Sequence, residues 1–400
     1  MNQYPSNNYQ NNQNNPYPPY QPVPPTQGNA QYNPYGQGNQ YNQYNQYNNP
    51  NAQNPYQQYG YTNPYYQRQY SPELQNMMQE SALRRKEKNS LILSGVVIGG
   101  ALILQLVIEV VFIMLLRVLK LDSIYNTSAT FQNCFNVIVV DLFGLGVPFT
   151  IAALILKKNF REASVPLIPT EKLGAAKTAA WTALGMGSCV IGNIVTNAVI
   201  KLFDLLGYEL TQPEMAKPDG IVALIAGVIA VAVAPALFEE YAMRCVSLGV
   251  LRKYGKAFAV IAVSVVFGLI HGNLIQFVFA FIVGLVLGYV TVRTDSIVPA
   301  IIIHGCNNGI SVVGDFVKYY VSDKTAETVQ NYIIFAWAAL AVGGLIYLIV
   351  KHALLPDKSK ADSAPKSRLS FGAKLACLLP GFSVPFLILI GFTSQYIQKK

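Results

Sequence analysis

The chain carries little charge for its length. Of its 400 residues, only 12% are Asp, Glu, Lys or Arg, whereas 52% are hydrophobic. The apolar residues come in long blocks, unlike the short alternations of a soluble protein. This composition excludes an ordinary soluble globular domain and predicts an all-α, polytopic helical membrane bundle.

The sequence also has no paired cysteines, and we expect no cleavable leader. No CxxC spacing occurs, so neither a disulfide framework nor a thiolate metal site is indicated, and we expect isolated, buried thiols. The five cysteines lie singly in or beside apolar segments, at Cys134, Cys189, Cys245, Cys306 and Cys377. Because the first residues form neither a basic nor an apolar region, we expect the first spanning helix to direct insertion.

The formal net charge of +9 does not point to nucleic acid. The basic residues form short clusters between apolar blocks, as the positive-inside rule arranges them, so we expect contacts with anionic lipid. One cluster, Arg84-Arg85-Lys86-Glu87-Lys88, directly precedes an apolar run that begins at Leu91. It predicts a multi-pass integral membrane protein with a cytoplasmic N-terminus, in the plasma membrane if the cell is bacterial.

The N-terminal part has almost no aliphatic side chains. Residues 1–72 are nearly all Asn, Gln, Tyr, Pro and Gly, and such a tract is expected to be disordered because it buries too little apolar surface. It is either an inert tail or a binding segment for a cytoplasmic partner, and the sequence leaves both open. Residues 73–90 form an amphipathic, basic juxtamembrane segment.

Apolar blocks fill the rest of the chain and predict eight or nine membrane helices. Residues 91–350 form the expected core, and residues 351–400 form a basic loop with a C-terminal transmembrane helix. The blocks lie at about 91–119, 133–156, 173–203, 220–237, 257–271, 274–292, 296–314, 331–350 and 375–396.

Two carboxylates and a guanidinium interrupt the block that starts at Gly220. Glu240 and Arg244 are four residues apart on a helix, which favours an ion pair between them. Glu239 is rotated by about 100° from Glu240 and is left without that partner, as a catalytic base would be. Pro235 lies one turn earlier, and a kink there would aim Glu239 into a cavity.

Two further polar motifs follow in neighbouring apolar blocks. His271 ends one block, and His304 and Asn308 share a helical face in another, where both side chains can donate to an oxyanion. Each motif alone has a structural explanation, such as a hydrogen-bonded histidine or an interhelical amide contact. Three such motifs in successive membrane segments favour a water-activating site.

A metal site is the alternative form of this chemistry. Glu239, His271 and His304 would make a His₂Glu zinc set with one open position. However, the chain has no His-Glu-x-x-His helix, which supplies two ligands and the base together. The preferred interpretation is water activated directly by Glu239 with no cofactor required, and zinc remains open.

These motifs resemble those of the CPBP intramembrane proteases. This family comprises the type II CaaX prenyl endopeptidases and the bacterial Abi proteins of bacteriocin processing or self-immunity, and it is often labelled metalloprotease. The matching motifs have the family's order and spacing within residues 220–315. They read Glu239-Glu240-x-x-x-Arg244, Phe267-x-x-x-His271 and His304-x-x-x-Asn308.

The resemblance implies an eight-helix membrane core that hydrolyses a peptide bond. By this resemblance, Glu239 is the base, His271 is its partner, and His304 with Asn308 forms the oxyanion hole. Glu240 and Arg244 would be positioning and structural residues.

The resemblance leaves the substrate open. The expected partner is a membrane-associated protein or peptide, with or without a prenyl group. A non-catalytic scaffold or bacteriocin self-immunity protein that uses the cavity for binding is the alternative. A transporter is disfavoured because the two halves show no inverted repeat.

Overall fold

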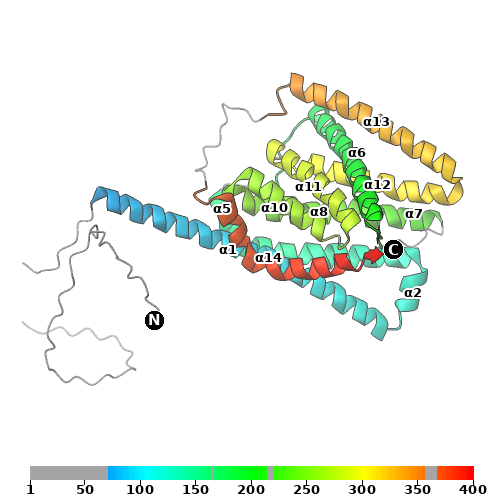
Figure 1. The fold of residues 1–400 in the computed structure, drawn as a ribbon, viewed down its shortest axis with the longest axis horizontal. Coiled ribbons are helices and arrows are strands. Elements are labelled where there is room, and N and C mark those ends of the chain that lie inside the picture. The colour runs from blue at the N-terminus through cyan, green and yellow to red at the C-terminus, as the bar shows by residue number, and fades with distance from the viewer. Residues whose placement is uncertain (1–70, 164–165, 214–219, 356–366) are drawn as a thin grey trace, which may run out of the picture. The chain divides into compact units, whose positions relative to one another are not determined.

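The computed structural model describes residues 71–163, 166–213, 220–355 and 367–400. The chain divides into two units, and all described residues belong to the second, Tyr70–Lys400. This unit is almost entirely helical, so the predicted all-α class is confirmed (Figure 1). The predicted disordered tail, residues 1–72, lies outside the described residues except for its last two positions, where Ser71 caps the first helix.

The described unit is a succession of helices with two short strands. Three segments, η1, η2 and η3, are π-helical, and η4 is a 3-10 turn. The elements are α1 (Pro72–Val118), α2 (Asp122–Thr127), α3 (Ala129–Phe135), η1 (Asn136–Gly146), α4 (Val147–Ile155), α5 (Lys157–Ala163), α6 (Ala175–Leu205), β1 (Tyr208–Leu210), α7 (Ile221–Gly227), η2 (Val228–Val233), α8 (Ala234–Glu240), η3 (Tyr241–Ser247), α9 (Leu248–Leu251), η4 (Arg252–Tyr254), α10 (Lys256–Leu269), α11 (Leu274–Thr294), α12 (Val298–Tyr320), α13 (Asp323–Val350), α14 (Phe371–Ser394) and β2 (Ile397–Lys399).

Within the described residues, eight helical stretches are long and apolar enough to cross a membrane, which confirms the predicted eight or nine. They are Pro72–Val118, Ala129–Ile155, Ala175–Leu205, Ile221–Tyr254, Leu274–Thr294, Val298–Lys318, Asp323–Val350 and Phe371–Ser394. Helix α10 is equally apolar but has only 14 residues. The spans expose large apolar side chains, such as Leu205 and Leu387, as a surface in contact with lipid requires. The chain is therefore an integral, multi-pass membrane protein.

The fourth span carries the charged motif. It runs without interruption from α7 through η2, α8 and η3 to Tyr254, well beyond the end of the apolar block at residue 237. Pro235 is the second residue of α8, and Ala234 alone separates it from the π-helical turn η2. Because proline has no N–H to donate, a wider turn before it accommodates the break in the hydrogen-bond ladder.

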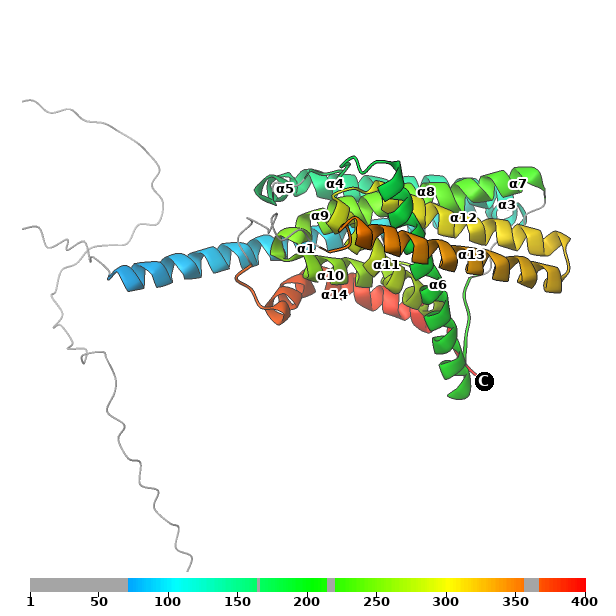
Figure 2. The ribbon, with the colours of Figure 1, turned by 90° about the horizontal axis from the view of Figure 1, so that it is seen from above.

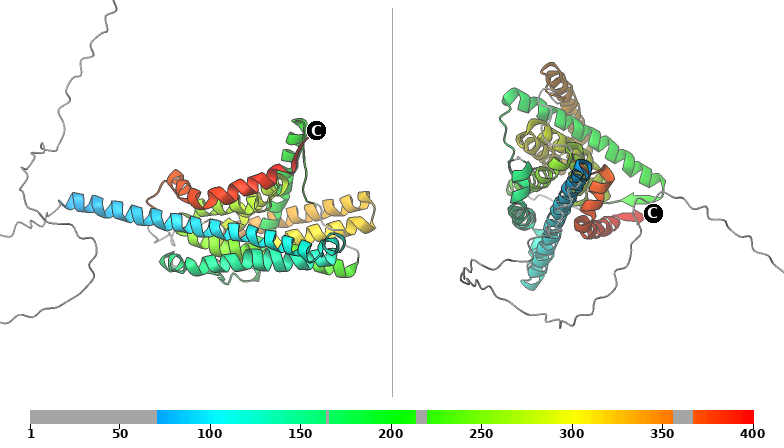
Figure 3. Two further views of the ribbon diagram at one scale, coloured as in Figure 1. Left: turned by 90° about the horizontal axis from the view of Figure 1, so that it is seen from below. Right: turned by 90° about the vertical axis from the view of Figure 1, so that its left-hand side faces the viewer.

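Helices α1 and α14 lie side by side, although they are far apart in the sequence (Figure 3). Gly95 and Gly99 form a small-xxx-small face on α1 that meets Gly381 on α14. A Cβ at Gly99 would collide with the backbone carbonyl of Gly381, so only glycine permits this approach. The C-terminal helix predicted within residues 351–400 is thus part of the bundle.

One end of the bundle gathers charged side chains. Lys86 of α1 and Lys253 of η4 both face Glu162 of α5, at 3.9 and 3.5 Å. Arg368, just before α14, pairs with Glu80 of α1 at 3.1 Å. Strands β1 and β2 pair antiparallel at the other end, where α6 ends beside the C-terminus (Figure 2).

None of the five cysteines is in a disulfide, as predicted. Cys189, Cys245 and Cys377 are buried. Cys134 is exposed, so the prediction of buried thiols is wrong for this residue. Cys134 lies on α3 among apolar side chains of α1 and η1, where a thiol behaves as a small hydrophobic group.

Candidate active site

The end of α8 places two consecutive glutamates in different surroundings. Glu240 is fully buried, whereas the side chain of Glu239 is 16% exposed. Successive residues on a helix point about 100° apart, so one of the two carboxylates faces a cavity while the other enters the protein interior. The structure shows that Glu239 is the one at the cavity.

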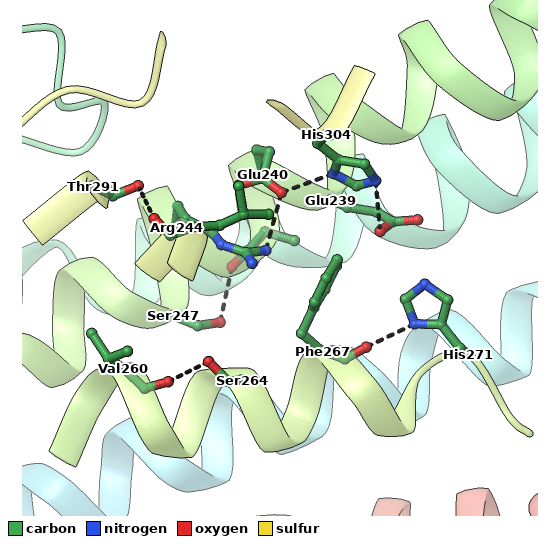
Figure 4. Close-up of polar contacts among 12 residues, drawn as sticks. Glu239, Glu240, Arg244, Ser247, Val260, Ser264, Phe267, His271, Thr291 and His304 are labelled. Atoms are coloured by element: carbon green, nitrogen blue, oxygen red, sulfur yellow. Dashed lines mark hydrogen bonds and ion pairs between the residues drawn. The ribbon is translucent and has the colours of Figure 1, made fainter. Parts of the chain in front are cut away.

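Glu240 is held by two partners. Its Oε1 lies 3.1 Å from Nη1 of Arg244, which confirms the predicted ion pair, and 2.9 Å from Nδ1 of His304 (Figure 4). Arg244 is also stacked on the ring of Phe267, with 4.3 Å between the guanidinium carbon and the ring centroid. This buried network joins α8, η3, α10 and α12.

Phe267 connects the charged network with both histidines. Its ring makes edge contacts with the rings of His271 and His304, with centroid distances of 5.2 and 5.8 Å. One aromatic side chain therefore packs against three of the polar residues singled out in the sequence. The sequence motif Phe267-x-x-x-His271 thus has a structural basis in side-chain packing.

His271 lies just after the C-terminal end of α10 and is fixed in orientation. Its Nδ1 is 2.8 Å from the carbonyl oxygen of Phe267, and because that oxygen only accepts, Nδ1 carries the proton and Nε2 has the lone pair. Gly272 has φ +68°, and the side chain of Asn273 donates to the His271 carbonyl at 3.1 Å. Asn273 also caps α11 by accepting from the N–H of Gln276.

The shortness of α10 places this turn inside the membrane. At about 1.5 Å per residue, its 14 residues span roughly 21 Å, less than the hydrocarbon thickness of about 30 Å. Helix α10 packs against α11, which carries the chain back. His271 is half-buried there and lines a cavity of the bundle.

Glu239 and His271 line one cavity of about 150 Å³, several times the volume that one water needs. His304 contacts Glu239 at the edge of this cavity, with 3.8 Å between His304 Nε2 and Glu239 Oε2. Figure 4 shows the ring of His304 between the two glutamates, and Phe267 between Arg244 and His271. The structure thus brings together the first three predicted site residues.

Asn308 lies one turn after His304 on α12 and contacts η2. Its Nδ2 donates to the carbonyl oxygen of Val231 in η2 at 2.9 Å, and its Oδ1 accepts from Nδ2 of Asn307 at 3.1 Å. One Asn308 N–H is thus bonded to the backbone of the π-helical turn. The second N–H is the one left for a ligand.

The cavity also contains polar residues that the sequence motifs do not include. Gln105 and Glu109 of α1 line it, and Asp141 of η1, next to the lining residue Val140, is buried within electrostatic reach of Glu109 and Glu239. These residues come from the first two apolar blocks, far from the motifs. A polar residue within an apolar block was the signal that could have revealed them.

The arrangement does not match a zinc centre. In the described part of the chain, no three or more His, Cys, Asp or Glu side chains are grouped as metal ligands require. Nδ1 of His304 is bonded to Glu240, and its Nε2 faces Glu239 at 3.8 Å. The zinc alternative with Glu239, His271 and His304 thus stays a prediction.

Comparison with known families agrees with the motifs. Residues 221–310 match the family described as type II CAAX prenyl endopeptidase Rce1-like. No curated protein and no solved structure matches the chain significantly. The predicted resemblance to the CPBP family is confirmed over these residues, which lie within the apolar helices of the bundle.

Proposed function

We propose that the protein is an intramembrane endopeptidase in which Glu239 activates water. The observation that carries this proposal is that two adjacent carboxylates have different surroundings. Glu240 is bound by Arg244 and His304, whereas Glu239 faces a cavity together with His271. A carboxylate with room for water beside a neutral imidazole is what general base catalysis needs.

The reaction follows from the positions of the donors and acceptors. Glu239 takes a proton from water while the water oxygen attacks the carbonyl carbon of the substrate, and Nε2 of His271 orients that water by accepting its second hydrogen. The resulting oxyanion receives hydrogen bonds from His304 Nε2–H and from the free N–H of Asn308. Glu239 then returns the proton to the amide nitrogen, and the C–N bond breaks to give a carboxylate and an amine.

Glu240 and Arg244 act in this scheme as positioning residues. A proton on each ring nitrogen of His304 allows Nδ1 to donate to Glu240 while Nε2–H remains for the oxyanion. Arg244 balances the charge of Glu240 in the protein interior. The network therefore sets the orientation of His304 before substrate arrives.

We propose a membrane-associated polypeptide as the substrate, including one with a CaaX-like prenyl group. An apolar pocket of about 250 Å³ lies between α1, α3 and η1, lined by residues such as Phe112, Phe131 and Val139. Two of these elements, α1 and η1, also carry Glu109 and Val140 of the polar cavity. Such a pocket suits a hydrocarbon chain beside the bond to be cleaved.

We further propose that the N-terminus is cytoplasmic. Lys86, in the basic cluster before the first apolar block, shares Glu162 with Lys253, which lies at the end of the fourth span. The basic segments before the first span and after the fourth therefore lie at the same end of the bundle, as an even number of crossings requires. The test introduces a cysteine near residue 70 of a cysteine-free protein and adds a membrane-impermeant thiol reagent to intact cells. We expect no labelling, and labelling would show that the N-terminus is outside the cell.

The test of activity uses purified full-length protein in detergent or lipid with a panel of membrane-anchored peptides, prenylated and unprenylated. We expect cleavage by the wild type and by a Glu327→Gln control, which removes an exposed glutamate on α13. Glu239→Gln and His271→Ala should remain folded and lose cleavage. Full activity in Glu239→Gln overturns the assignment of the base, and a folded wild type that cleaves no peptide overturns the proposed function.

A further inference from the structure

The cavity has a second polar wall that the proposed mechanism does not use. Gln105 and Glu109 lie one helical turn apart on α1, and Nε2 of Gln105 donates to Oε1 of Glu109 at 3.1 Å. A Cβ at Gly144 would lie 3.5 Å from the same Glu109 oxygen, so the carboxylate rests against η1. Asp141, which is 3% exposed, stands on η1 nearby.

This wall contains a buried acceptor that has no donor. Gln105 is 7% exposed, and its Oε1 has no hydrogen-bond partner among the described residues. The electrostatic neighbours of Asp141 are the two like-charged residues Glu239 and Glu109. A buried acceptor without a donor is costly, and two acidic side chains beside it favour a donor that carries a positive charge.

The described protein does not supply that donor. Among the described residues that line the cavity, His271 is the one with a basic side chain, and its Nδ1–H is bonded to the Phe267 carbonyl. Arg244, the neighbouring cation, is paired with Glu240. The described residues that line the cavity therefore leave Gln105 Oε1 without a donor.

The remaining cavity wall is apolar and suits the stem of a long side chain. It includes Leu102, Leu106, Leu145 and Leu389. A lysine side chain has a flexible four-carbon stem and three N–H donors, and an arginine side chain has a similar stem and five. Either one places apolar atoms against the leucines and donors against Gln105, Glu109 and Asp141.

We propose that Gln105, Glu109 and Asp141 form a subsite for a basic side chain, Lys or Arg, of the polypeptide substrate. The subsite opens into the cavity of Glu239 and His271, so the basic residue lies close in sequence to the cleaved bond. This inference rests on the proposed function, because it assigns the specificity of the same site. Gln105, Glu109 and Asp141 select the substrate and take no part in bond cleavage.

The test compares paired peptides that carry either lysine or norleucine at successive positions on either side of the cleaved bond. Norleucine keeps the stem and removes the charge. We expect wild type to prefer lysine at one position by about tenfold or more in kcat/KM, the range of a hydrogen bond to a charged group. Glu109→Gln and Asp141→Asn should bring this ratio towards one, whereas Asp122→Asn, an exposed control on α2, should keep it.

A binding measurement separates failure of the subsite from failure of the proposed function. The Glu239→Gln protein, which lacks the base, should bind the lysine peptide more tightly than its norleucine partner by a similar factor, whether or not the wild type cleaves it. Equal binding and equal cleavage of the two peptides at every position overturns the subsite. Lysine preference that survives in both Glu109→Gln and Asp141→Asn overturns the assignment to these residues.

Discussion

His304 and Glu240 are bonded to each other inside the bundle, with 2.9 Å between Nδ1 and Oε1, although 64 residues separate them in the chain. The contact joins the third polar motif to the first. It also occupies one oxygen of the carboxylate that directly follows Glu239 in the sequence. The two consecutive glutamates of α8 thus have different partners, and we assign them different roles.

The ion pair of Arg244 and Glu240 gives the first prediction. Arg244→Met should destabilise the protein by about 3–5 kcal/mol, because it removes one partner and leaves a buried charge behind. The double change Arg244→Met with Glu240→Gln should recover part of this loss. Denaturant unfolding in a fixed detergent measures both, and a double variant less stable than the single one would contradict the explanation.

The third motif gives the second prediction. His304→Ala and Asn308→Ala should each lower kcat by about 10²–10³-fold, because each removes a donor to the oxyanion. KM should change much less, since the donors act mainly in the transition state. Steady-state kinetics with Asn193→Ala, an exposed control on α6, provides the comparison. A change confined to KM would assign both residues to substrate binding instead.

Metal removal gives the third prediction. We expect a strong zinc chelator to leave peptide cleavage unchanged, because the described His, Cys, Asp and Glu side chains form no ligand group. Elemental analysis of the purified protein should show zinc well below one atom per chain. Loss of activity on chelation, restored by added zinc, would assign Glu239, His271 and His304 to a metal.

The contact of α1 with α14 gives the fourth prediction. Gly99→Ala should destabilise the bundle by about 1–3 kcal/mol, because the added Cβ collides with the backbone at Gly381. Gly100 is the matched control, since a Cβ there meets nothing within 4 Å. Gly100→Ala should be neutral or slightly stabilising, because alanine has the higher helix propensity. Equal effects of the two changes would show that α14 does not depend on this contact.

Much of the fold could be predicted from the sequence. The lengths of the apolar blocks indicated eight or nine helices, and the short block at 257–271 became the short helix α10. The spacing of Glu240 and Arg244 predicted their ion pair, because residues four apart share a helical face. These features depend on neighbours along the chain, which the sequence displays directly.

The partners of the site residues could not be predicted in the same way. The sequence placed Glu240 with Arg244 but gave no sign of its bond to His304, and it did not relate Gln105, Glu109 or Asp141 to the charged motif. The pairing of β1 with β2 was likewise hidden, since the two strands have few residues and are far apart in the sequence.

The sequence by itself determined a membrane protein of long apolar helices, with a glutamate pair, two histidines and an asparagine in the order of an intramembrane protease family. Only the tertiary structure decided that Glu239 faces the cavity while Glu240 is bound, and which side chains of α1 and η1 complete that cavity. The physical reason is that a carboxylate's role depends on the donors, charges and space around it. In a helical bundle these come from other helices, whose packing the local sequence does not specify.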